Sequence, residues 1–371
     1  MLLVAEYAMN PKELTLLIIA GGKSSRLGRD KRELKLGTLP LLEITLAKGK
    51  KAGFREIFLC AEAPSPFLDE LAKKYAASLA FDVRPGLGPV SGLAQGLSLI
   101  SSPCALAVAG DMPFLDLEGL CRFGKALASA ELALVPRASG RLQPLAAFYR
   151  KETAPYFQTA LQKDSRKIRQ VLAAFAHAQR EYTGSPADFF NVNTPADWRL
   201  AQGRFANLHR KVPLISVTAP ASGTGKTTFI ERLLPSLAAR GIKAGVVKSD
   251  SHGFNLDMEG KDSFRFTQAG AQSVAVVSPK GWFLSQRTEK RASLEAIAAK
   301  MDGIDLLLTE SRSHGTMPAL SLWRGKGEPL KGEDAVALFT FAPQAKATEL
   351  YEYHLDNTEK AVELCLFLMG R

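Results

Sequence analysis

Two stretches of this 371-residue chain decide its fold: LTLLIIAGGKSSR at residues 14–26 and VPLISVTAPASGTGKTT at residues 212–228. Each begins as a short apolar strand, passes through a glycine-containing turn and continues into a helical pattern. Short apolar runs separated by longer amphipathic segments follow them, at 56–61, 105–109, 132–136, 244–248, 273–277 and 306–309. Buried strands alternating with helices predict parallel α/β sheets, and two such starts indicate two separate sheets.

A basic segment with a helical pattern, at 198–211, lies between the two halves. We therefore predict two domains, at 1–206 and 212–371. Each is expected to be a three-layer, doubly wound α/β domain, with a Rossmann-like sheet in the first half and a P-loop NTPase sheet in the second.

The composition narrows the environment and the partners. The net charge of +11 suits polyanions, whether nucleic acid, an acidic membrane surface or small phosphorylated ligands, and the charge alone does not choose among them. Because no basic patch is interleaved with aromatic residues, nucleic acid is not an expected partner. The four scattered cysteines predict neither a disulfide framework nor a zinc site and fit a reducing cytosol. With no basic leader and no apolar run of about 18 residues, we expect a cytoplasmic protein without a membrane segment.

The first glycine turn carries the chemistry of an anion site. Without a Cβ, Gly21 and Gly22 let backbone N–H groups approach a phosphate closely. Arg26 and Lys31 add a bidentate donor and a mobile positive charge. Asp111 ends a later apolar run, and a carboxylate at that end of a parallel strand lies where such sheets bind ligands.

Several stretches together resemble the MobA family of molybdenum cofactor guanylyltransferases, within the wider nucleotidyltransferase superfamily. The resemblance covers roughly residues 14–200. It rests on segments that fall in the family's order, at 16–31, 36–42, 88–92, 109–115 and 190–195.

This resemblance implies transfer of GMP from GTP to molybdopterin or Mo-molybdopterin, with release of pyrophosphate. It assigns Arg26, Lys31 and Asp111 to catalysis, with Mg²⁺ held by Asp111. It places Asn191 and Asn193 toward the pterin or product. The residues implied to bind GTP are Ala20, Gly21, Gly22, Lys31, Gly88, Pro89 and Asp111.

Some of these residues have structural alternatives. The asparagines belong to NVNTP, which is also typical of a turn and helix N-cap. Tyr149 and the segment 143–145 fit either the site or the core. The family usually has an acidic residue close before its second glycine loop, whereas here Asp82 lies early and Arg84 changes the charge, which leaves base or acceptor recognition in that loop open.

The second glycine turn reads as a P-loop, because it follows a strand and opens a helix. Its nucleotide-binding residues are predicted to be Ser222, Gly223, Thr224, Gly225, Lys226, Thr227 and Thr228. Lys226 would bridge the β- and γ-phosphates, and the Thr227 hydroxyl would reach Mg²⁺. Pro220 occupies the position of the motif's first glycine, so the entry to the loop must differ from the standard form.

The segments at 247–252, 257–263, 269–271 and 305–310 resemble MobB, the GTP-binding adaptor of the same pathway. This resemblance implies GTP binding, weak GTPase activity, a homo-oligomer formed through the C-terminal domain, and association with other molybdenum cofactor proteins and apo-molybdoenzymes. Lys261, Asp262 and Glu310 are further candidates for the nucleotide site, as is His252. Ser311 stands where the family often has glycine.

Two rival functions stay open. The same chemistry with other substrates would make a cytidylyltransferase or a sugar 1-phosphate nucleotidyltransferase, although the MobB-like half favours the molybdenum pathway. A different class is a nucleotide-dependent cofactor carrier or adaptor without transferase activity.

Overall fold

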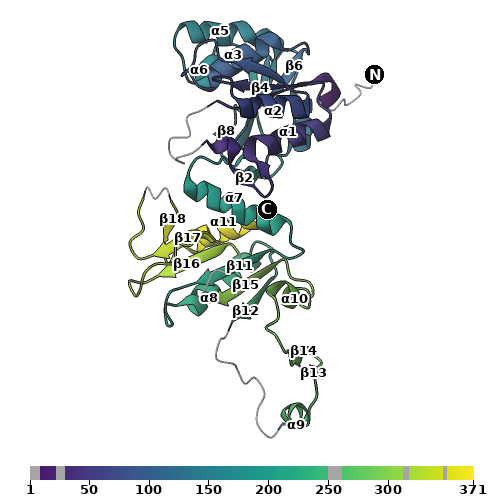
Figure 1. Cartoon of the computed structure of the whole chain (residues 1–371), viewed down its shortest axis with the longest axis vertical. Helices are drawn as coiled ribbons and strands as arrows, with labels where there is room; N and C mark the ends of the chain where they lie inside the picture. Colours follow the sequence, from purple (N-terminus) through teal and green to yellow (C-terminus); the bar gives the residue numbers. More distant parts are fainter. Residues whose placement is uncertain (1–8, 22–29, 250–260, 312–316, 346–348) are drawn as a thin grey trace. The chain divides into compact units, whose positions relative to one another are not determined.

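The computed structural model describes residues 9–21, 30–249, 261–311, 317–345 and 349–371. The chain divides into two compact units, Met1–Phe205 with Gly370–Arg371, and Ala206–Met369. Both are built from a β-sheet with helices packed on it (Figure 1).

The N-terminal unit contains a mixed sheet in the order β10-β7-β9-β6-β1-β4-β5, with β8 paired to β7. Its strands are β1 Thr15–Ile19, β4 Glu56–Ala61, β5 Ser78–Phe81, β6 Cys104–Ala109, β7 Ala133–Ala138, β8 Arg141–Leu142, β9 Ala146–Arg150 and β10 His177–Glu181; β2 Lys35–Leu36 and β3 Leu39–Pro40 form a separate pair. β1, the first predicted strand, lies between β4 and β6 and is parallel to both.

The prediction of a purely parallel first sheet is wrong at β9, which runs antiparallel to both β6 and β7. The chain reverses after β7 through Ser139 and Gly140, whose φ angles are +47° and +71°. Two left-handed residues in a row make the tight turn that joins antiparallel strands, so no helical crossover is needed.

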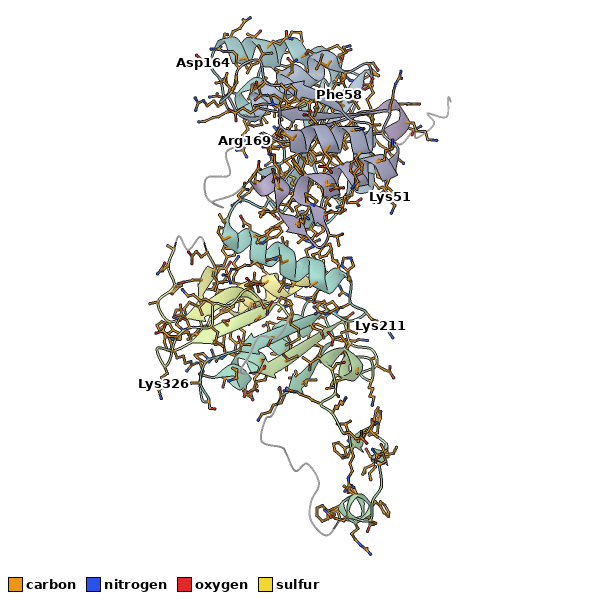
Figure 2. The ribbon with its side chains drawn as sticks, in the orientation of Figure 1. Lys51, Phe58, Asp164, Arg169, Lys211 and Lys326 are labelled. Carbon is orange, nitrogen blue, oxygen red and sulfur yellow. The ribbon has the colours of Figure 1, made fainter. Side chains whose placement is uncertain are left out.

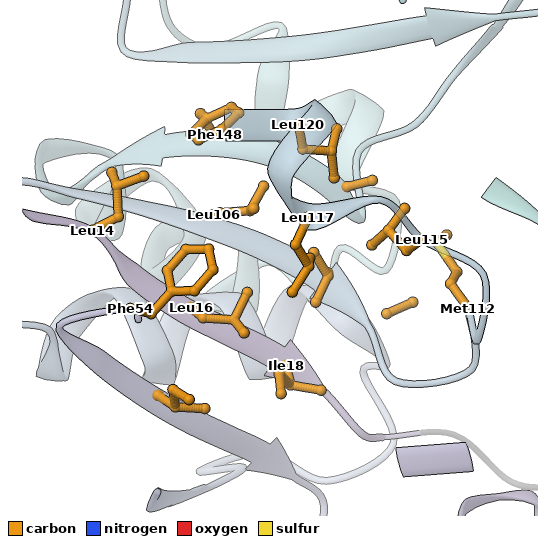
Figure 3. Close-up of a cluster of buried hydrophobic side chains, with 14 of the residues drawn as sticks. Leu14, Leu16, Ile18, Phe54, Leu106, Met112, Leu115, Leu117, Leu120 and Phe148 are labelled. Carbon is orange, nitrogen blue, oxygen red and sulfur yellow. The ribbon is translucent and has the colours of Figure 1, made fainter. Parts of the chain in front are cut away.

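Helices cover both faces of this sheet. Leu16 and Ile18 of β1 pack into one apolar cluster, whereas Leu17 and Ile19 pack into another on the opposite face, as the two-residue period of a strand requires. Figure 3 shows side chains of the first cluster. The helices are α1 Leu41–Ala52, α2 Pro66–Tyr75, α3 Pro89–Leu99, α4 Leu117–Phe123, α5 Ala154–Gln162, α6 Ile168–Leu172 and α7 Pro195–Leu208; short 3₁₀ turns are η1 Pro11–Glu13, η2 Lys31–Glu33, η3 Gly124–Ala126, η4 Lys151–Thr153 and η5 Pro186–Phe189.

The C-terminal unit contains a parallel sheet in the order β12-β15-β11-β16-β17-β18. Its strands are β11 Leu214–Thr218, β12 Ala244–Lys248, β15 Leu306–Ser311, β16 Ala319–Trp323, β17 Ala335–Thr340 and β18 Tyr351–His354; its helices are α8 Lys226–Ala238, α9 Asp262–Gln268, α10 Leu294–Ala298 and α11 Thr358–Met369. After β11 the chain adds β12 and β15 on one side of this strand, and then β16, β17 and β18 on the other side. The strand order therefore reverses at β11.

The predicted strand at 273–277 is real, but its predicted place in the parallel sheet is wrong. It forms β13 Ser273–Ser278, which pairs antiparallel with β14 Gly281–Gln286 in a two-stranded hairpin. Only two residues join these strands, and a parallel connection would need a crossover of a dozen or more. The hairpin exposes large apolar side chains, including Val277 and Trp282.

The described residues bear on two expectations, the state of the cysteines and the presence of a membrane-spanning helix. All four cysteines are buried and free, as predicted for a chain without a disulfide framework. Within the described residues, no helix is both long enough and apolar enough to cross a membrane.

Candidate functional site

A cavity in the N-terminal unit lies at the carboxyl ends of the adjacent strands β1 and β6. Its lining residues are Ile19, Ala20, Gly21, Lys31, Arg32, Pro89, Ala109, Gly110, Asp111, Leu145 and Asn191. The Gly110 N–H donates to the Ile19 carbonyl at 3.0 Å, which holds the two strand ends together. A Cβ on Gly21 would meet nothing within 4 Å. Packing therefore does not require glycine there, whereas close approach of a ligand to the backbone would.

Beside the cavity, contacts of Lys31 join three predicted residues that lie far apart in sequence. Lys31 Nζ lies 2.5 Å from Asp111 Oδ2 and 2.8 Å from Asn193 Oδ1. The side chains of Lys31 and Asp111 are only 17% and 15% exposed. Lys31 is positioned by η2, the short turn whose N-cap is Asp30.

The second oxygen of Asp111, Oδ1, is buried and has no hydrogen-bond partner. An unpartnered buried carboxylate oxygen is costly, and carboxylate oxygen is the donor that Mg²⁺ prefers. No cluster of three or more acidic, histidine or cysteine side chains suited to a metal occurs in the described part of the chain. The unpartnered oxygen of Asp111 is of the kind that would ligate Mg²⁺ alongside phosphates.

The predicted loop at 88–92 forms the start of α3. Gly88 is the N-cap, with φ +67° and ψ −148°, and Pro89 is the first helical residue and lines the cavity. Backbone N–H groups at a helix N-terminus favour anions. This geometry gives Gly88 a structural reason to be glycine, because its φ lies in the region other residues avoid.

The segment NVNTP serves the fold and also reaches the site. Asp197 Oδ2 accepts from the N–H of Asn193 (2.9 Å) and Thr194 (2.8 Å), and Thr194 Oγ1 accepts from the Asp197 N–H at 3.1 Å. This reciprocal capping begins α7. Asn191 lines the cavity and donates from Nδ2 to the Phe189 carbonyl at 3.1 Å.

A second hollow shares Pro89, Leu145 and Asn191 with the first and therefore adjoins it. It is further lined by Met112, Gln143, Pro144, Lys167, Ile168 and Arg169. Lys167 and Arg169 bring positive charge to its edge, and Figure 2 labels Arg169. The segment 143–145 thus reaches the site, whereas Tyr149 is fully buried and donates to the Pro144 carbonyl at 2.8 Å.

Asp82 and Arg84 are the charged residues in the segment between β5 and α3. Arg84 pairs with Asp164 at 3.0 Å and donates to the Leu161 carbonyl at 2.6 Å, so its charge is engaged at the end of α5. Asp82 follows β5, and burial raises its pKa to about 6. The nearby Ser91 hydroxyl acts in the opposite direction and lowers this pKa.

Sequence reasoning missed two cations near Asp111. Arg32 lines the cavity and is held by Asp30, with Nη2 and Oδ2 2.6 Å apart. Lys48, on α1, donates to the carbonyls of Pro113 (2.8 Å) and Leu115 (3.0 Å) in the loop after Asp111. Burial lowers the pKa of Lys48 to about 8. Arg32 is adjacent to the predicted Lys31, so the sequence could have indicated it as a site residue. Lys48 stands in a lysine-rich segment, where no residue pattern distinguishes one lysine from the others.

The second candidate site is the turn between β11 and α8. Gly223 and Gly225 have φ angles of +70° and +91°, and Gly225 is the N-cap of α8. Lys226 is buried, with Nζ 3.4 Å from the Ala221 carbonyl. Thr224 donates to the same carbonyl at 2.7 Å.

The structure brings Thr227 and Glu310 together, because the Thr227 hydroxyl donates to Glu310 Oε2 at 2.9 Å. Glu310 lies near the end of β15, which is adjacent and parallel to β11. Asp262 pairs with Arg265 within α9 at 3.5 Å, and the role predicted for Lys261 and Asp262 stays a prediction. Three predicted residues, Gly22, Arg26 and His252, lie outside the described residues.

These features define a class: a two-unit α/β protein in which a glycine follows an interior strand of each sheet and polar side chains gather at the carboxyl ends of the neighbouring strands. The MobA-like NTP transferase domain model matches residues 16–181, and the model described as molybdopterin guanine dinucleotide synthesis protein B matches residues 214–341.

Individual relatives agree with the two models. A probable molybdenum cofactor guanylyltransferase from Trichormus variabilis is 30% identical over 199 residues, which cover 53% of this chain and 93% of that protein. A molybdopterin-guanine dinucleotide biosynthesis adapter protein from Escherichia coli is 38% identical over 117 residues, which cover 30% of this chain and 66% of the adapter. The structure of molybdopterin-guanine dinucleotide biosynthesis protein A from Archaeoglobus fulgidus has a TM-score of 0.45 and 23% identity, covering 51% of this chain and 97% of that one.

The chain belongs to the MobA-like NTP transferase family through its N-terminal half and carries a MobB domain in its C-terminal half.

Proposed function

We propose that this chain is a molybdenum cofactor guanylyltransferase fused to a GTP-binding adaptor domain. Family membership and the names of its relatives support this reaction class. The observation that carries the proposal is Asp111, which pairs with Lys31 through one oxygen and keeps the other buried without a hydrogen-bond partner in the cavity. A Mg²⁺ ion bound with phosphates would commonly take one or two such carboxylates as its protein ligands.

In the proposed reaction, a phosphate oxygen of molybdopterin or Mo-molybdopterin attacks the α-phosphorus of GTP. The bond from the α-phosphorus to the bridging oxygen breaks, and pyrophosphate leaves with that electron pair. Such a transfer depends on alignment and charge neutralisation. Lys31 neutralises the triphosphate, the backbone at Gly21 lies close to the nucleotide, and Asp111 holds Mg²⁺, which stabilises charge on the phosphates when bound.

The adjoining second hollow suits the acceptor. GTP fills the cavity at β1 and β6, and the acceptor enters between α3 and Arg169, with its phosphate toward Lys167 and Arg169. Asn191 lines both hollows, which supports its placement between the two substrates.

In this proposal, the C-terminal unit supplies a second nucleotide site. The turn at 222–228 binds GTP, with Lys226 on the phosphates, Thr227 on Mg²⁺ and Glu310 beside it. The contact between Thr227 and Glu310 supports this arrangement, because a metal ligand and a strand-end carboxylate are then adjacent. Weak GTP hydrolysis, self-association through this unit, contacts with other molybdenum cofactor proteins and apo-molybdoenzymes, and a cytoplasmic location complete the proposal.

The test is an assay of the purified full-length protein with Mg²⁺, a molybdopterin source and GTP, CTP or ATP in turn. The products are pyrophosphate and a dinucleotide identified by mass. A guanine dinucleotide is the expected product. A cytosine dinucleotide would make the protein a cytidylyltransferase, and nucleotide binding without any dinucleotide would make it a carrier or adaptor.

A further inference from the structure

An arginine and an aromatic ring lie at the edge of the C-terminal sheet that carries the P-loop. Arg324 directly follows β16 and Phe341 directly follows β17. Because β11, β16 and β17 are consecutive parallel strands, their carboxyl ends meet at one edge. Ligands of open α/β sheets bind at this edge, where the strand order reverses.

Arg324 connects the ring to the P-loop. Its guanidinium carbon lies 5.4 Å from the centroid of the Phe341 ring, a cation–π distance. A Cβ placed on Gly225 would lie 3.0 Å from Nη2 of Arg324, so the guanidinium packs directly on the loop. The His354 ring lies beside Phe341, with centroids 6.3 Å apart.

The segment that carries Arg324 is fixed by its own turn and by the entry to the P-loop. Trp323 Nε1 donates to the Gly327 carbonyl at 2.8 Å. A Cβ on Gly327 would lie 3.5 Å from Cβ of Pro220. Pro220, the residue that replaces the first glycine of the motif, thus lies against this turn. Figure 2 labels Lys326, which belongs to the same turn.

Phe341 is 57% exposed. A single exposed aromatic residue needs no explanation, but this ring is held by a cation that also contacts the phosphate loop. Nucleobases stack on aromatic rings and on guanidinium planes. We propose that Phe341 and Arg324 form the platform for the purine base of the nucleoside triphosphate whose phosphates bind the P-loop. This inference rests on the proposed nucleotide binding by that loop.

Stacking recognises the face of a base and not its exocyclic groups. The platform therefore accepts guanine and adenine alike. A pyrimidine offers a smaller face and stacks less strongly. The C-terminal unit is a site for purine nucleoside triphosphates, with GTP and ATP bound within about tenfold of one another.

The experiment measures equilibrium binding of GTP, ATP, CTP and inorganic tripolyphosphate to the full-length protein. The part of the binding that Lys226→Ala removes defines the P-loop site and separates it from the N-terminal one. Phe341→Ala is the test variant and Phe341→Trp the conservative one. Phe266→Ala is the control, because this aromatic side chain on α9 is 59% exposed.

We expect Phe341→Ala to weaken the Lys226-dependent binding of GTP and ATP by about tenfold and to leave tripolyphosphate within about twofold. Phe341→Trp should keep both, and Phe266→Ala should change neither. Equal losses for GTP and tripolyphosphate, or no loss for GTP, would overturn the platform. If Lys226→Ala removes no nucleotide binding at all, the proposed function of the P-loop fails and the platform fails with it.

Discussion

In the N-terminal unit, the candidate site draws Lys31, Asp111 and Asn193 together across 80 and 162 residues of sequence. In the C-terminal unit, most of the polar groups come from one turn of seven residues, and among the described residues the predicted Glu310 reaches this turn from the neighbouring strand β15. The first site is thus made by the sheet and its loops, and the second chiefly by local backbone conformation. Substitutions of residues that do not touch the ligand should therefore affect the first site more strongly than the second.

Asp111→Ala should have the largest effect. Without the carboxylate, the proposed Mg²⁺ ion would lose its protein ligand and Lys31 would lose its ion pair with Asp111, so dinucleotide formation should fall by about 1,000-fold. Pyrophosphate release measures this loss, and thermal unfolding checks the fold. Asp69→Ala, an exposed position on α2, is the matched control. Turnover like that of the unaltered protein would remove Asp111 from metal binding.

Lys48→Met should have a smaller effect on the same site. The methionine keeps the buried stem but leaves the Pro113 and Leu115 carbonyls without their donor. The loop after Asp111 then relaxes, and kcat should fall about tenfold, with more Mg²⁺ needed for half-maximal rate. Lys48→Arg should restore part of the rate. Lys51→Met changes an exposed lysine of the same helix and should have no effect. An unchanged Mg²⁺ requirement in Lys48→Met would mean that Lys48 only stabilises the fold.

The contrast between Asp111 and Lys48 shows what the sequence reveals. Asp111 ends an apolar run within a motif, and the order of parallel strands then implies its neighbours. Lys48 acts through two backbone carbonyls, and such contacts leave no residue pattern. The directions of β9 and of the β13–β14 hairpin were also mispredicted. Apolar runs indicate where strands lie, whereas short turns determine whether neighbouring strands run parallel or antiparallel. The platform residues Arg324 and Phe341 follow strands β16 and β17, which were not among the predicted ones.

Lys226→Ala tests whether the second site works independently of the first. The substitution should abolish GTP binding at the P-loop, because Lys226 supplies the side-chain charge of that turn. Dinucleotide synthesis in the other unit should fall by less than about tenfold, since no residue of the first cavity comes from the P-loop. Binding stoichiometry and turnover measured on the same sample separate the two effects, with the exposed Lys280→Ala as control. Complete loss of synthesis would show that the P-loop takes part in the transfer.

Asp82→Asn should have the smallest effect, and it should appear in stability. Burial raises the pKa of Asp82 from 3.8 to about 6, so the folded unit disfavours the charged form. Between these pH values the unfolded chain releases the proton while the folded chain keeps it, and stability falls as pH rises. The penalty is absent below pH 3.8 and complete above about pH 6.

The asparagine carries no charge and should escape this penalty. At pH 7 the unfolding temperature of the N-terminal unit should rise by about 2 °C, whereas at pH 4 the variant and the unaltered protein should unfold together. Calorimetry across this pH range measures the difference. Asp69→Asn, which removes an exposed carboxylate, should show no comparable gain. A stabilisation of equal size at both pH values would mean that side-chain packing, and not the buried charge, distinguishes position 82.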